Sequence, residues 1–500
     1  MKLFAKRSLV IVITTFTVAV VNAQVKNIAY YISKAPFTMP QVTAPTFADK
    51  TFSITDYGAV ADDKTLNTAA FAKAIEACTN AGGGKVLVPA GTWITGPIEL
   101  KSNVDLHLEK GALVQFTSDH KQYPMIKLGG GNNISPQPPL YAYKATNIAL
   151  TGQGIFDGAG DTWRPVKKSK APAEVWQALP KTGVISSDGK IWWPSGEAMA
   201  GEVVVDRLKD NTNATPDDYI TARDFLRPYM LQLISCENIL IDGVALRNSP
   251  KFVLYPNKCT NLIISNATIF NDWWAQNGDG MDISACKNVV VYKTTVSAGD
   301  DGICMKSSNY KDSTPQLQNI IVAGCTVLRA HGGFVIGSNT DGQMKNIYVA
   351  DCKFIGSDIG VRVKSNYGRG GLVTNVYVDN ITMSAIPEEA ILFTTDYEDV
   401  VAGKSAKGVS ATDKAPEFAN FHFSNIRCTQ ANTAISIKGL PDVPAHDIYF
   451  DNVDITAKNG FSSTDAKNIF LNNVLINGDK PEFSTKRTSN VVLDGKVIVK

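Results

Sequence analysis

The sequence lacks the clusters of side chains that usually bind a metal ion. It contains no Cys-x-x-Cys pair, and its five histidines are scattered along 500 residues. It also lacks an excess of charge of one sign, because 49 lysines and arginines stand against 47 aspartates and glutamates. A nucleic-acid-binding protein usually carries a clear positive excess. We therefore expect no metal, no cofactor and no nucleic-acid partner.

Long apolar runs are missing too, except near the start of the chain. Lys2, Lys6 and Arg7 precede an apolar run over residues 9–21, and Ala23 offers a small residue at a cleavage point. This order is typical of a signal peptide, whereas a membrane-spanning helix needs roughly 20 apolar residues. We predict a signal peptide over residues 1–23 and an exported protein, periplasmic or extracellular, with no membrane contact after cleavage. Removal of the signal peptide, which contains Lys2, Lys6 and Arg7, would change the formal net charge of the chain from +2 to 2 − 3 = −1.

What the sequence does contain is a repeat, in which an asparagine is followed by alternating apolar residues. It begins at Asn103, Asn147, Asn238, Asn261, Asn288, Asn319, Asn346, Asn375, Asn420, Asn468 and Asn490, with Asp447 in the remaining slot. Eight of the nine spacings from Asn238 onward lie between 21 and 31 residues (261 − 238 = 23, for example), whereas a propeller blade takes about 40. Short strands without helices between them bury a face only by stacking coil on coil. We predict an all-β chain, a single-stranded right-handed parallel β-helix over residues 51–500.

Four segments have a different pattern or lie outside the repeat. Apolar residues at helical spacing over residues 65–80 predict an amphipathic helix that caps the open end of the core. We expect residues 24–50 to be extended and residues 400–416 to form an exposed loop. An insertion near residues 158–230 carries aromatic and basic residues: Trp163, Arg164, Lys167, Lys168, Trp176, Trp192, Trp193 and Arg223. These side chains could bind a sugar acid, or they could form a small core of the insertion itself.

Five of the eight cysteines fall into two sets in the repeat, one two residues before the asparagine (Cys236, Cys259, Cys286) and one six residues after it (Cys325, Cys352). Stacked coils would bring them within disulfide reach, and an exported protein permits disulfides. Small apolar side chains that stack inside a solenoid nevertheless need no covalent bond. We favour free buried thiols and keep disulfides as the alternative.

Four consecutive segments between residues 277 and 364 can be aligned at a shared glycine: residues 279–283, 301–305, 332–336 and 359–363. Odd positions after the glycine are apolar in all four, which predicts stacked strands with one buried face. The even positions then share the opposite face, where Asp282, Arg362, Ser284, Lys306 and Lys364 fall. Just before the glycines stand Asp279, Asp300, Asp301 and His331.

Such crowded carboxylates suit acid and base catalysis. Glycoside hydrolysis needs one protonated carboxyl to release the leaving oxygen and one ionised carboxylate to act on water or carbon. Neighbouring negative charges raise the pKa of one carboxyl and so supply the acid. The alternative is that the Asp-Gly pairs only form turns. Turns alone do not explain why three carboxylates, one imidazole and several cations share one patch.

At these residues the sequence resembles a known family. The segments Asn277-Gly278-Asp279, Gly299-Asp300-Asp301, His331-Gly332 and Arg362-Val363-Lys364 are similar, in order and spacing, to the four signatures of glycoside hydrolase family 28, the polygalacturonases. Gly278 departs from the usual threonine, and Ala330 stands where a glycine is common. The resemblance implies inverting hydrolysis of α-1,4-linked galacturonan without a metal.

The same resemblance implies a role for each motif residue. Asp300 would be the general acid, Asp279 and Asp301 would hold and activate water, and His331 would support the protonation of the acid. Substrate binding would fall to Arg362, Lys364, Asn277 and Lys306. We expect a pectic polysaccharide as substrate and a monomeric enzyme.

The run His331–Ser338 and the pair Trp192-Trp193 resemble the exo-acting members, in which loops close one end of the cleft. Other readings stay open. A rhamnogalacturonan or xylogalacturonan hydrolase of the same family is the nearest alternative. A calcium-dependent pectate lyase, with the aspartates holding the ion, and a non-catalytic carbohydrate-binding β-helix are more distant ones.

Overall fold

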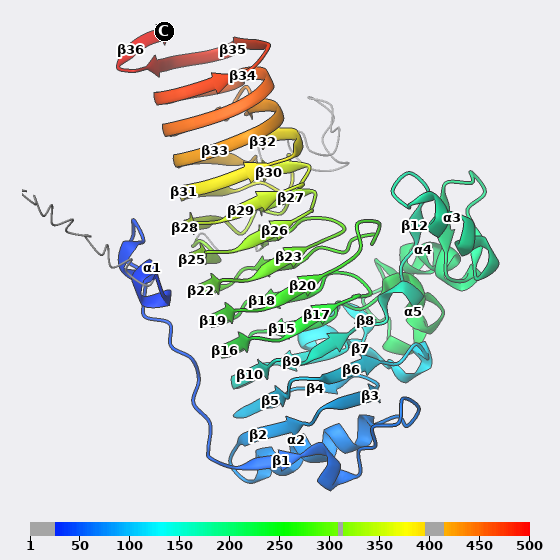
Figure 1. Ribbon diagram of the computed structural model, residues 1–500. Coiled ribbons are helices and arrows are strands. Elements are labelled where there is room, and N and C mark those ends of the chain that lie inside the picture. Colours follow the sequence, from blue (N-terminus) through cyan, green and yellow to red (C-terminus); the bar gives the residue numbers. More distant parts are fainter. Residues whose placement is uncertain (1–25, 309–313, 396–414) are drawn as a thin grey trace, which may run out of the picture.

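The computed structural model describes residues 26–308, 314–395 and 415–500. The predicted signal peptide and nearly all of the loop predicted over residues 400–416 lie outside these ranges. The described chain winds into coils of short strands that pair in parallel with the coils before and after them (Figure 1). The coils are right-handed, the usual hand of such crossovers. The prediction of a right-handed parallel β-helix is confirmed.

Three faces of strands enclose the core. The face that carries the aligned glycine segments consists of β4 (Ile98–Glu99), β9 (Leu140–Tyr143), β15 (Leu231–Ile234), β18 (Leu254–Asn257), β21 (Met281–Ser284), β24 (Ile303–Lys306), β27 (Gly332–Ile336), β30 (Ile359–Lys364) and β32 (Ile386–Thr394). The second face consists of β1 (Thr51–Ser53), β2 (Gly84–Val88), β5 (Val104–Leu108), β10 (Thr146–Gly152), β16 (Glu237–Asp242), β19 (Thr260–Ser265), β22 (Lys287–Tyr292), β25 (Leu317–Ala323) and β28 (Met344–Ala350). The third consists of β3 (Gly91–Thr95), β6 (Ala112–Phe116), β11 (Ile155–Asp157), β17 (Ala245–Arg247), β20 (Thr268–Phe270), β23 (Thr295–Ser297), β26 (Thr326–Leu328) and β29 (Lys353–Ile355).

The last coils are longer strands that run around more than one face. They are β31 (Leu372–Ser384), β33 (Glu417–Lys438), β34 (Ala445–Asn477) and β35 (Lys480–Leu493). The short β36 (Lys496–Val499) then turns back antiparallel to β35 and covers the end of the stack (Figure 1). At the other end the helix α2 (Thr68–Asn80) buries Phe71, Ile75 and Cys78 against the first coils. The predicted capping helix is therefore present.

The aligned glycine segments pair as the sequence predicts. Met281 is the register partner of Ile303, Ile303 of Phe334, and Phe334 of Val361. All four side chains are buried in one continuous apolar core. A one-residue slip would turn all of them outward, so burial of this column fixes the register of the whole face.

The repeated asparagines form a ladder beside the core. Their φ angles lie between 52° and 63°, a left-handed conformation that asparagine tolerates better than most residues. From Asn147 onward, each side-chain amide donates a hydrogen bond to the equivalent side chain of the preceding coil, as Asn261 does to Asn238 at 3.1 Å. The ladder runs from Asn103 to Asn420 and again from Asp447 to Asn490. All eight cysteines are buried and free, which confirms the prediction of thiols.

The expectation of an extended segment over residues 24–50 is wrong for α1 (Ile28–Lys34). The side chain of Asn27 accepts a hydrogen bond from the backbone N–H of Tyr30 and caps this helix. Tyr31 and Ile32 then pack against the outer side of the second face, and the Tyr31 hydroxyl donates to Asp351 at 2.7 Å. Figure 1 shows α1 beside the stack, far along it from β1.

The insertion between β11 and β15 projects from one side of the stack (Figure 1). It contains α3 (Ala173–Ala178), α4 (Gly196–Leu208), α5 (Arg223–Leu226) and an antiparallel sheet of β12 (Val166–Lys167), β13 (Val184–Ile185) and β14 (Ile191–Trp193). The hairpin β7 (Met125–Lys127) and β8 (Ile134–Pro136) lies at its base. Short 3₁₀ turns complete the fold: Ile54–Tyr57, His120–Gln122, Leu128–Gly130, Gly160–Thr162, Leu179–Lys181 and Pro216–Ala222. No helix in the described ranges is long and apolar enough to cross a membrane.

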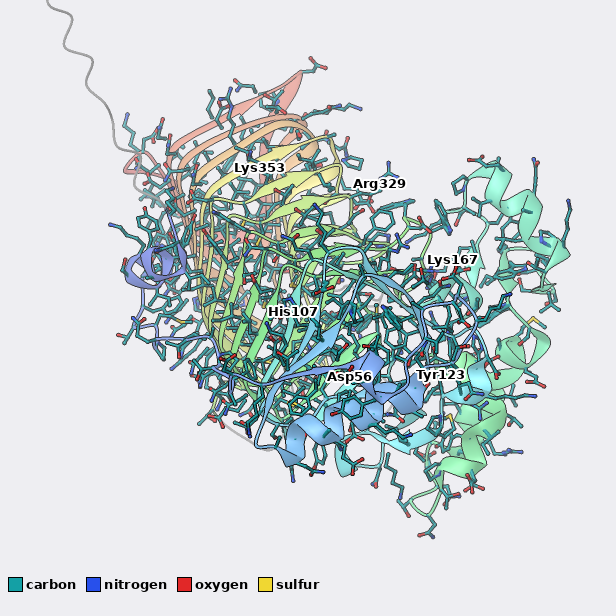
Figure 2. All side chains as sticks on the ribbon, turned by 60° about the horizontal axis from the view of Figure 1, so that its bottom comes forward. Asp56, His107, Tyr123, Lys167, Arg329 and Lys353 are labelled. Atoms are coloured by element: carbon teal, nitrogen blue, oxygen red, sulfur yellow. The ribbon has the colours of Figure 1, made fainter. Side chains whose placement is uncertain are left out.

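Two of the insertion residues singled out from the sequence, Trp163 and Arg164, contact residues outside the insertion. Trp163 is fully buried and stacks on His120, with ring centroids 3.5 Å apart, while Tyr123 packs edge-on to it at 5.1 Å. Tyr123 is labelled in Figure 2 where the insertion joins the stack. Arg164 is buried as well and donates to the side chain of Asn248 at 3.1 Å. These side chains therefore anchor the insertion to the β-helix.

Candidate active site

The candidate site lies where β21, β24, β27 and β30 begin. The glycines that open β21 and β24 are needed because neighbouring coils approach closely there. A Cβ atom on Gly280 would lie 2.4 Å from Cγ1 of Val296 and 2.7 Å from the carbonyl oxygen of Gly302. A Cβ on Gly302 would lie 2.8 Å from Cγ1 of Val327. The aligned glycines thus bring the aspartates before them onto one sheet edge.

Three aspartates converge at this edge. Asp279, Asp300 and Asp301 each offer a carboxylate oxygen, and these oxygens lie within 4.8 Å of one another. Asp279 and Asp301 are 4% and 2% exposed, whereas the side chain of Asp300 is 24% exposed. Within the described part of the chain, Oδ1 of Asp279 and Oδ1 of Asp301 have no hydrogen-bond partner. Asp300 can therefore reach a substrate while the other two oxygens can accept from a water molecule.

Buried lysines neutralise part of this negative charge. Nζ of Lys364 lies 2.8 Å from Oδ2 of Asp301, and both side chains are almost fully buried. Nζ of Lys306 lies 3.0 Å from Oδ1 of Asp282 and donates to the carbonyl oxygen of Gly337 at 3.1 Å. Both lysines were expected to bind substrate, and the structure pairs each of them with an aspartate. Each lysine stabilises a buried carboxylate that would otherwise be costly to ionise.

The environments of Asp279 and Asp301 shift their pKa values in opposite directions. Burial raises the pKa of Asp279 well above its usual value, and the charges of Asp282 and Asp300 add to the effect. Burial alone would also raise the pKa of Asp301, but the cations, Lys364 first, lower it below the usual range. Asp301 therefore stays ionised while Asp279 holds a proton more tightly. Titratable groups separated in this way are typical of acid and base pairs.

His331 stands beside the exposed aspartate. Its Nδ1 lies 3.5 Å from Oδ1 of Asp300, and its ring centroid lies 5.3 Å from that of Trp273. On the other side, Nε2 lies 2.6 Å from Nζ of Lys170, which also donates to the carbonyl oxygen of Gly299 at 3.1 Å. Burial lowers the pKa of His331, and the charge of Asp300 opposes this effect.

The structure brings all eight predicted residues to this region, and it adds others that the sequence did not single out. Lys170 comes from the insertion and contacts the site directly. Arg227, at the end of the insertion, donates to the side chain of Asn277 at 3.0 Å. Asp358 lies with Oδ2 3.9 Å from Nε2 of His331. The basic composition of the insertion was the one available signal for the two cations, and nothing in the repeat pointed to Asp358.

The aspartate cluster could also be considered as a cation site, since its oxygens converge. Calcium takes six to eight oxygen ligands, and Lys364 already occupies one oxygen of Asp301. The positive charges of Lys306 and Arg362 act on the same carboxylate. The arrangement of charges therefore fits proton transfer better than cation binding.

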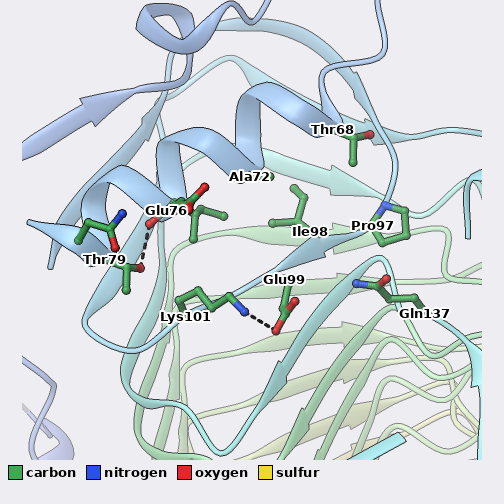
Figure 3. Close-up of a pocket in the computed structure, with 11 residues that line it drawn as sticks. Thr68, Ala72, Glu76, Thr79, Pro97, Ile98, Glu99, Lys101 and Gln137 are labelled. Atoms are coloured by element: carbon green, nitrogen blue, oxygen red, sulfur yellow. Dashed lines mark hydrogen bonds and ion pairs between the residues drawn. The ribbon is translucent and has the colours of Figure 1, made fainter. Parts of the chain in front are cut away.

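Another pocket lies between the capping helix α2 and β4 (Figure 3). Its volume is about 410 Å³, and its polar lining includes the ion pair of Lys101 and Glu99, with Nζ and Oε1 2.6 Å apart. None of the converging aspartates lines it. This pocket offers no acid and base pair comparable to that at the strand edge.

The converging carboxylates on this edge of the β-helix supply the acid and the base that glycoside hydrolysis requires. A family model described as Glycosyl hydrolases family 28 matches residues 220–475, which is more than half of the chain. The chain belongs to this family. A second model, described as rhamnogalacturonase A/epimerase, pectate lyase-like, matches residues 51–112.

Known proteins of both exo and endo type are similar to this chain. An exo-poly-alpha-D-galacturonosidase of Dickeya chrysanthemi is 27% identical over 478 residues, covering 91% of this chain and 76% of that protein. An endo-polygalacturonase of Pectobacterium carotovorum subsp. carotovorum is 25% identical over 404 residues, covering 79% and 85%. The crystal structure of a hyperthermoactive exopolygalacturonase from Thermotoga maritima matches with a TM-score of 0.69 and 25% identity, covering 94% of this chain and 96% of that one.

Proposed function

We propose that the protein hydrolyses the α-1,4-galacturonosidic bonds of polygalacturonan, the backbone of pectin. The observation that carries this proposal is the convergence of Asp279, Asp300 and Asp301 within 4.8 Å, with buried cations beside them. The relatives whose names specify polygalacturonan cleavage support the choice of substrate.

In this proposal Asp300 is the general acid. It is the exposed member of the three, so it can deliver its proton to the leaving glycosidic oxygen. The buried oxygens of Asp279 and Asp301 hold the attacking water. Asp301, which Lys364 keeps ionised, can accept the proton of this water, and Asp279 helps to hold the water in place.

The remaining motif residues recognise the galacturonate. Arg362 supplies positive charge toward its carboxylate, and Lys364 and Lys306 add to the same field from their ion pairs with Asp301 and Asp282. Asn277, positioned by Arg227, offers its side chain to a sugar hydroxyl.

We also propose that the enzyme is an exported monomer, periplasmic or extracellular.

Exo action is the mode that we propose. Two cations of the insertion reach the site, because Lys170 contacts His331 and Arg227 contacts Asn277. An insertion tied to the catalytic edge in this way limits how far a polymer can extend beyond it. We propose that the insertion closes this end of the site, so that attack starts from a chain end.

Inversion of the anomeric configuration is part of the proposal, and it rests on the family. Inverting glycosidases usually separate their carboxyl groups by roughly 6.5–9.5 Å, whereas the nearest oxygens here lie within 4.8 Å. The spacing taken alone would favour retention. Proton NMR of the first product decides between the two outcomes, since the anomers differ before mutarotation.

The test of the function is a product profile. The mature protein is incubated with polygalacturonate, with and without a chelator, and the products are separated by size. Saturated monomer released from the outset and unaffected by chelator is the expected result. Mixed oligomers would overturn exo action, unsaturated products would indicate a lyase, and an absence of products would contradict the substrate and lead to rhamnogalacturonan and xylogalacturonan as the next substrates.

A further inference from the structure

Lys170 belongs to the insertion and contacts His331 and the backbone of Gly299 at the site. Its Nζ lies 2.6 Å from Nε2 of His331 and 3.1 Å from the carbonyl oxygen of Gly299. It also lies 5.3 Å from the ring centroid of Trp273. Three groups of the β-helix therefore contact the ammonium group of Lys170, although Lys170 belongs to the insertion. None of the four family signatures contains this lysine.

The short contact determines which protonation state of His331 is compatible with Lys170. An ammonium group has donors only, so it can approach Nε2 at 2.6 Å only if that nitrogen is an unprotonated acceptor. The proton of a neutral imidazole then sits on Nδ1, the nitrogen that faces Asp300 at 3.5 Å. We propose that Lys170 is a positioning residue that holds His331 as the neutral Nδ1–H tautomer.

This role matters for the acid, and in that respect it rests on the proposed function. A cationic imidazolium beside Asp300 would favour its ionised form and so remove the proton that the leaving oxygen needs. A neutral ring with Nδ1–H toward Asp300 places a donor there without a charge on the ring itself. Lys170 thus couples the insertion to the readiness of the general acid.

The other charged groups around His331 and Lys170 include some that raise and some that lower the pKa values of these two residues. Burial lowers the pKa of His331, and Lys170 and Arg362 lower it further, while Asp300 and Asp301 raise it. Oδ2 of Asp358 also faces the ring, 3.9 Å from Nε2. Burial likewise lowers the pKa of Lys170, and the nearby carboxylates oppose the effect. The groups that face Lys170 are Asp300, Lys167, Asp358 and Asp279. Removal of the lysine charge would therefore let His331 take up a proton at higher pH.

The first experiment observes the histidine ring directly. Protein labelled with ¹⁵N-histidine is titrated by NMR, and the signals of His331 are assigned by comparison with a His331→Gln sample. We expect neutral wild-type His331 with its proton on Nδ1 through the mildly acidic range. In Lys170→Met the ring should titrate about one pH unit higher and lose the single tautomer. Lys170→Arg, which keeps a cationic donor, should resemble the wild type.

The second experiment follows kcat/KM for polygalacturonate against pH. Lys170→Met should lose about tenfold more activity at the acid end of the profile than at its optimum, as expected for a shift of one unit. Lys190→Met is the matched control, because Lys190 lies in the same insertion and its side chain is 78% exposed. Its profile should match that of the wild type, and thermal unfolding of each variant separates misfolding from a change in protonation.

The proposal is overturned if His331 carries its proton on Nε2 in the wild type, or if Lys170→Met leaves its titration unchanged. The NMR result does not depend on the substrate. A protein that fails to cleave polygalacturonate would therefore refute the proposed function while leaving the tautomer measurement to test the role of Lys170.

Discussion

Replacing Lys364 with methionine should destabilise the protein strongly at neutral pH. Lys364 and Asp301 form an ion pair at 2.8 Å, and their side chains are 3% and 2% exposed. Removal of one partner from a buried pair leaves an uncompensated charge and typically costs about 3–5 kcal/mol. We expect a loss of this size in the free energy of unfolding at pH 7, measured by urea denaturation.

The pH dependence gives the prediction its sharper form. In the wild type the folded pKa of Asp301 is depressed, so its stabilising contribution is complete above the unfolded value of about 3.9 and is lost as pH falls through the folded value. In Lys364→Met the burial that the lysine had offset would push this pKa upward. Asp301 could then take up a proton at mildly acidic pH and relieve its own cost. The difference between variant and wild type should therefore shrink as pH falls from 7 toward 4.

Two further proteins complete the experiment. Lys353→Met removes an exposed lysine from the outside of β29, labelled in Figure 2, and should change stability by no more than about 0.5 kcal/mol. The double variant Lys364→Met/Asp301→Asn, which contains no unpaired charge at this position, should recover at least about 2 kcal/mol. A loss below about 1 kcal/mol in Lys364→Met, or a loss equal at pH 7 and pH 4, would refute the reasoning.

Three other changes test separate parts of the structure. Asp300→Asn should lower kcat on polygalacturonate about 10²–10⁴-fold with little change in KM, because it removes the transferable proton and keeps the shape; a retained kcat would exclude Asp300 as the acid. Asn288→Ala should lower the free energy of unfolding by about 2–4 kcal/mol in urea denaturation. The variant loses the hydrogen bonds to Asn261 and Asn319, and it puts alanine, whose side chain makes no hydrogen bond, at φ 57°. Asn288→Gly should cost about 1 kcal/mol less, and equal losses would show that the left-handed backbone contributes nothing. Burial and Glu388 raise the pKa of Asp358 to about 6, so its charged form destabilises the fold as pH rises from the unfolded value of about 3.9 through 6. Asp358→Asn should therefore be more stable than the wild type by about 1–2 kcal/mol at pH 7 and nearly equal to it at pH 4; the reverse order would contradict the assigned shift.

The sequence predicts what depends on periodicity. Alternation of apolar residues after Gly280, Gly302, Gly333 and Gly360 was sufficient to give the register of β21, β24, β27 and β30, because only one register buries Met281 and its partners together. The same alignment placed the aspartates before the glycines on one edge. The recurring asparagines marked the coils, since each occupies the same left-handed position and joins the same ladder.

Contacts between segments without a shared period could not be predicted. Lys170 and His331 are separated by 161 positions, and Arg227 and Asn277 by 50. Their proximity depends on how the insertion folds against the stack, through packing such as that of Trp163 on His120. Helix α1 was missed for a related reason, because a helix of only seven residues leaves little periodic signal in the sequence. It is stabilised by its cap at Asn27 and by the packing of Tyr31 and Ile32 against the outer face of the sheet.

The division of roles among the three carboxylates also follows from register rather than from residue type. All are aspartates, and their ordinary pKa values would be the same. Lys364 stands two coils beyond Asp301 in the stack, close enough for its long side chain to reach back and pair with it. Asp279 lacks a lysine partner of this kind among the described residues, and burial raises its pKa, with Asp282 and Asp300 adding to the effect. A slip of one residue in β30 would turn Lys364 away from Asp301 and bring Val363 onto the polar face. The apolar core and the asparagine ladder that prevent such a slip therefore also maintain the acid and base character of the site.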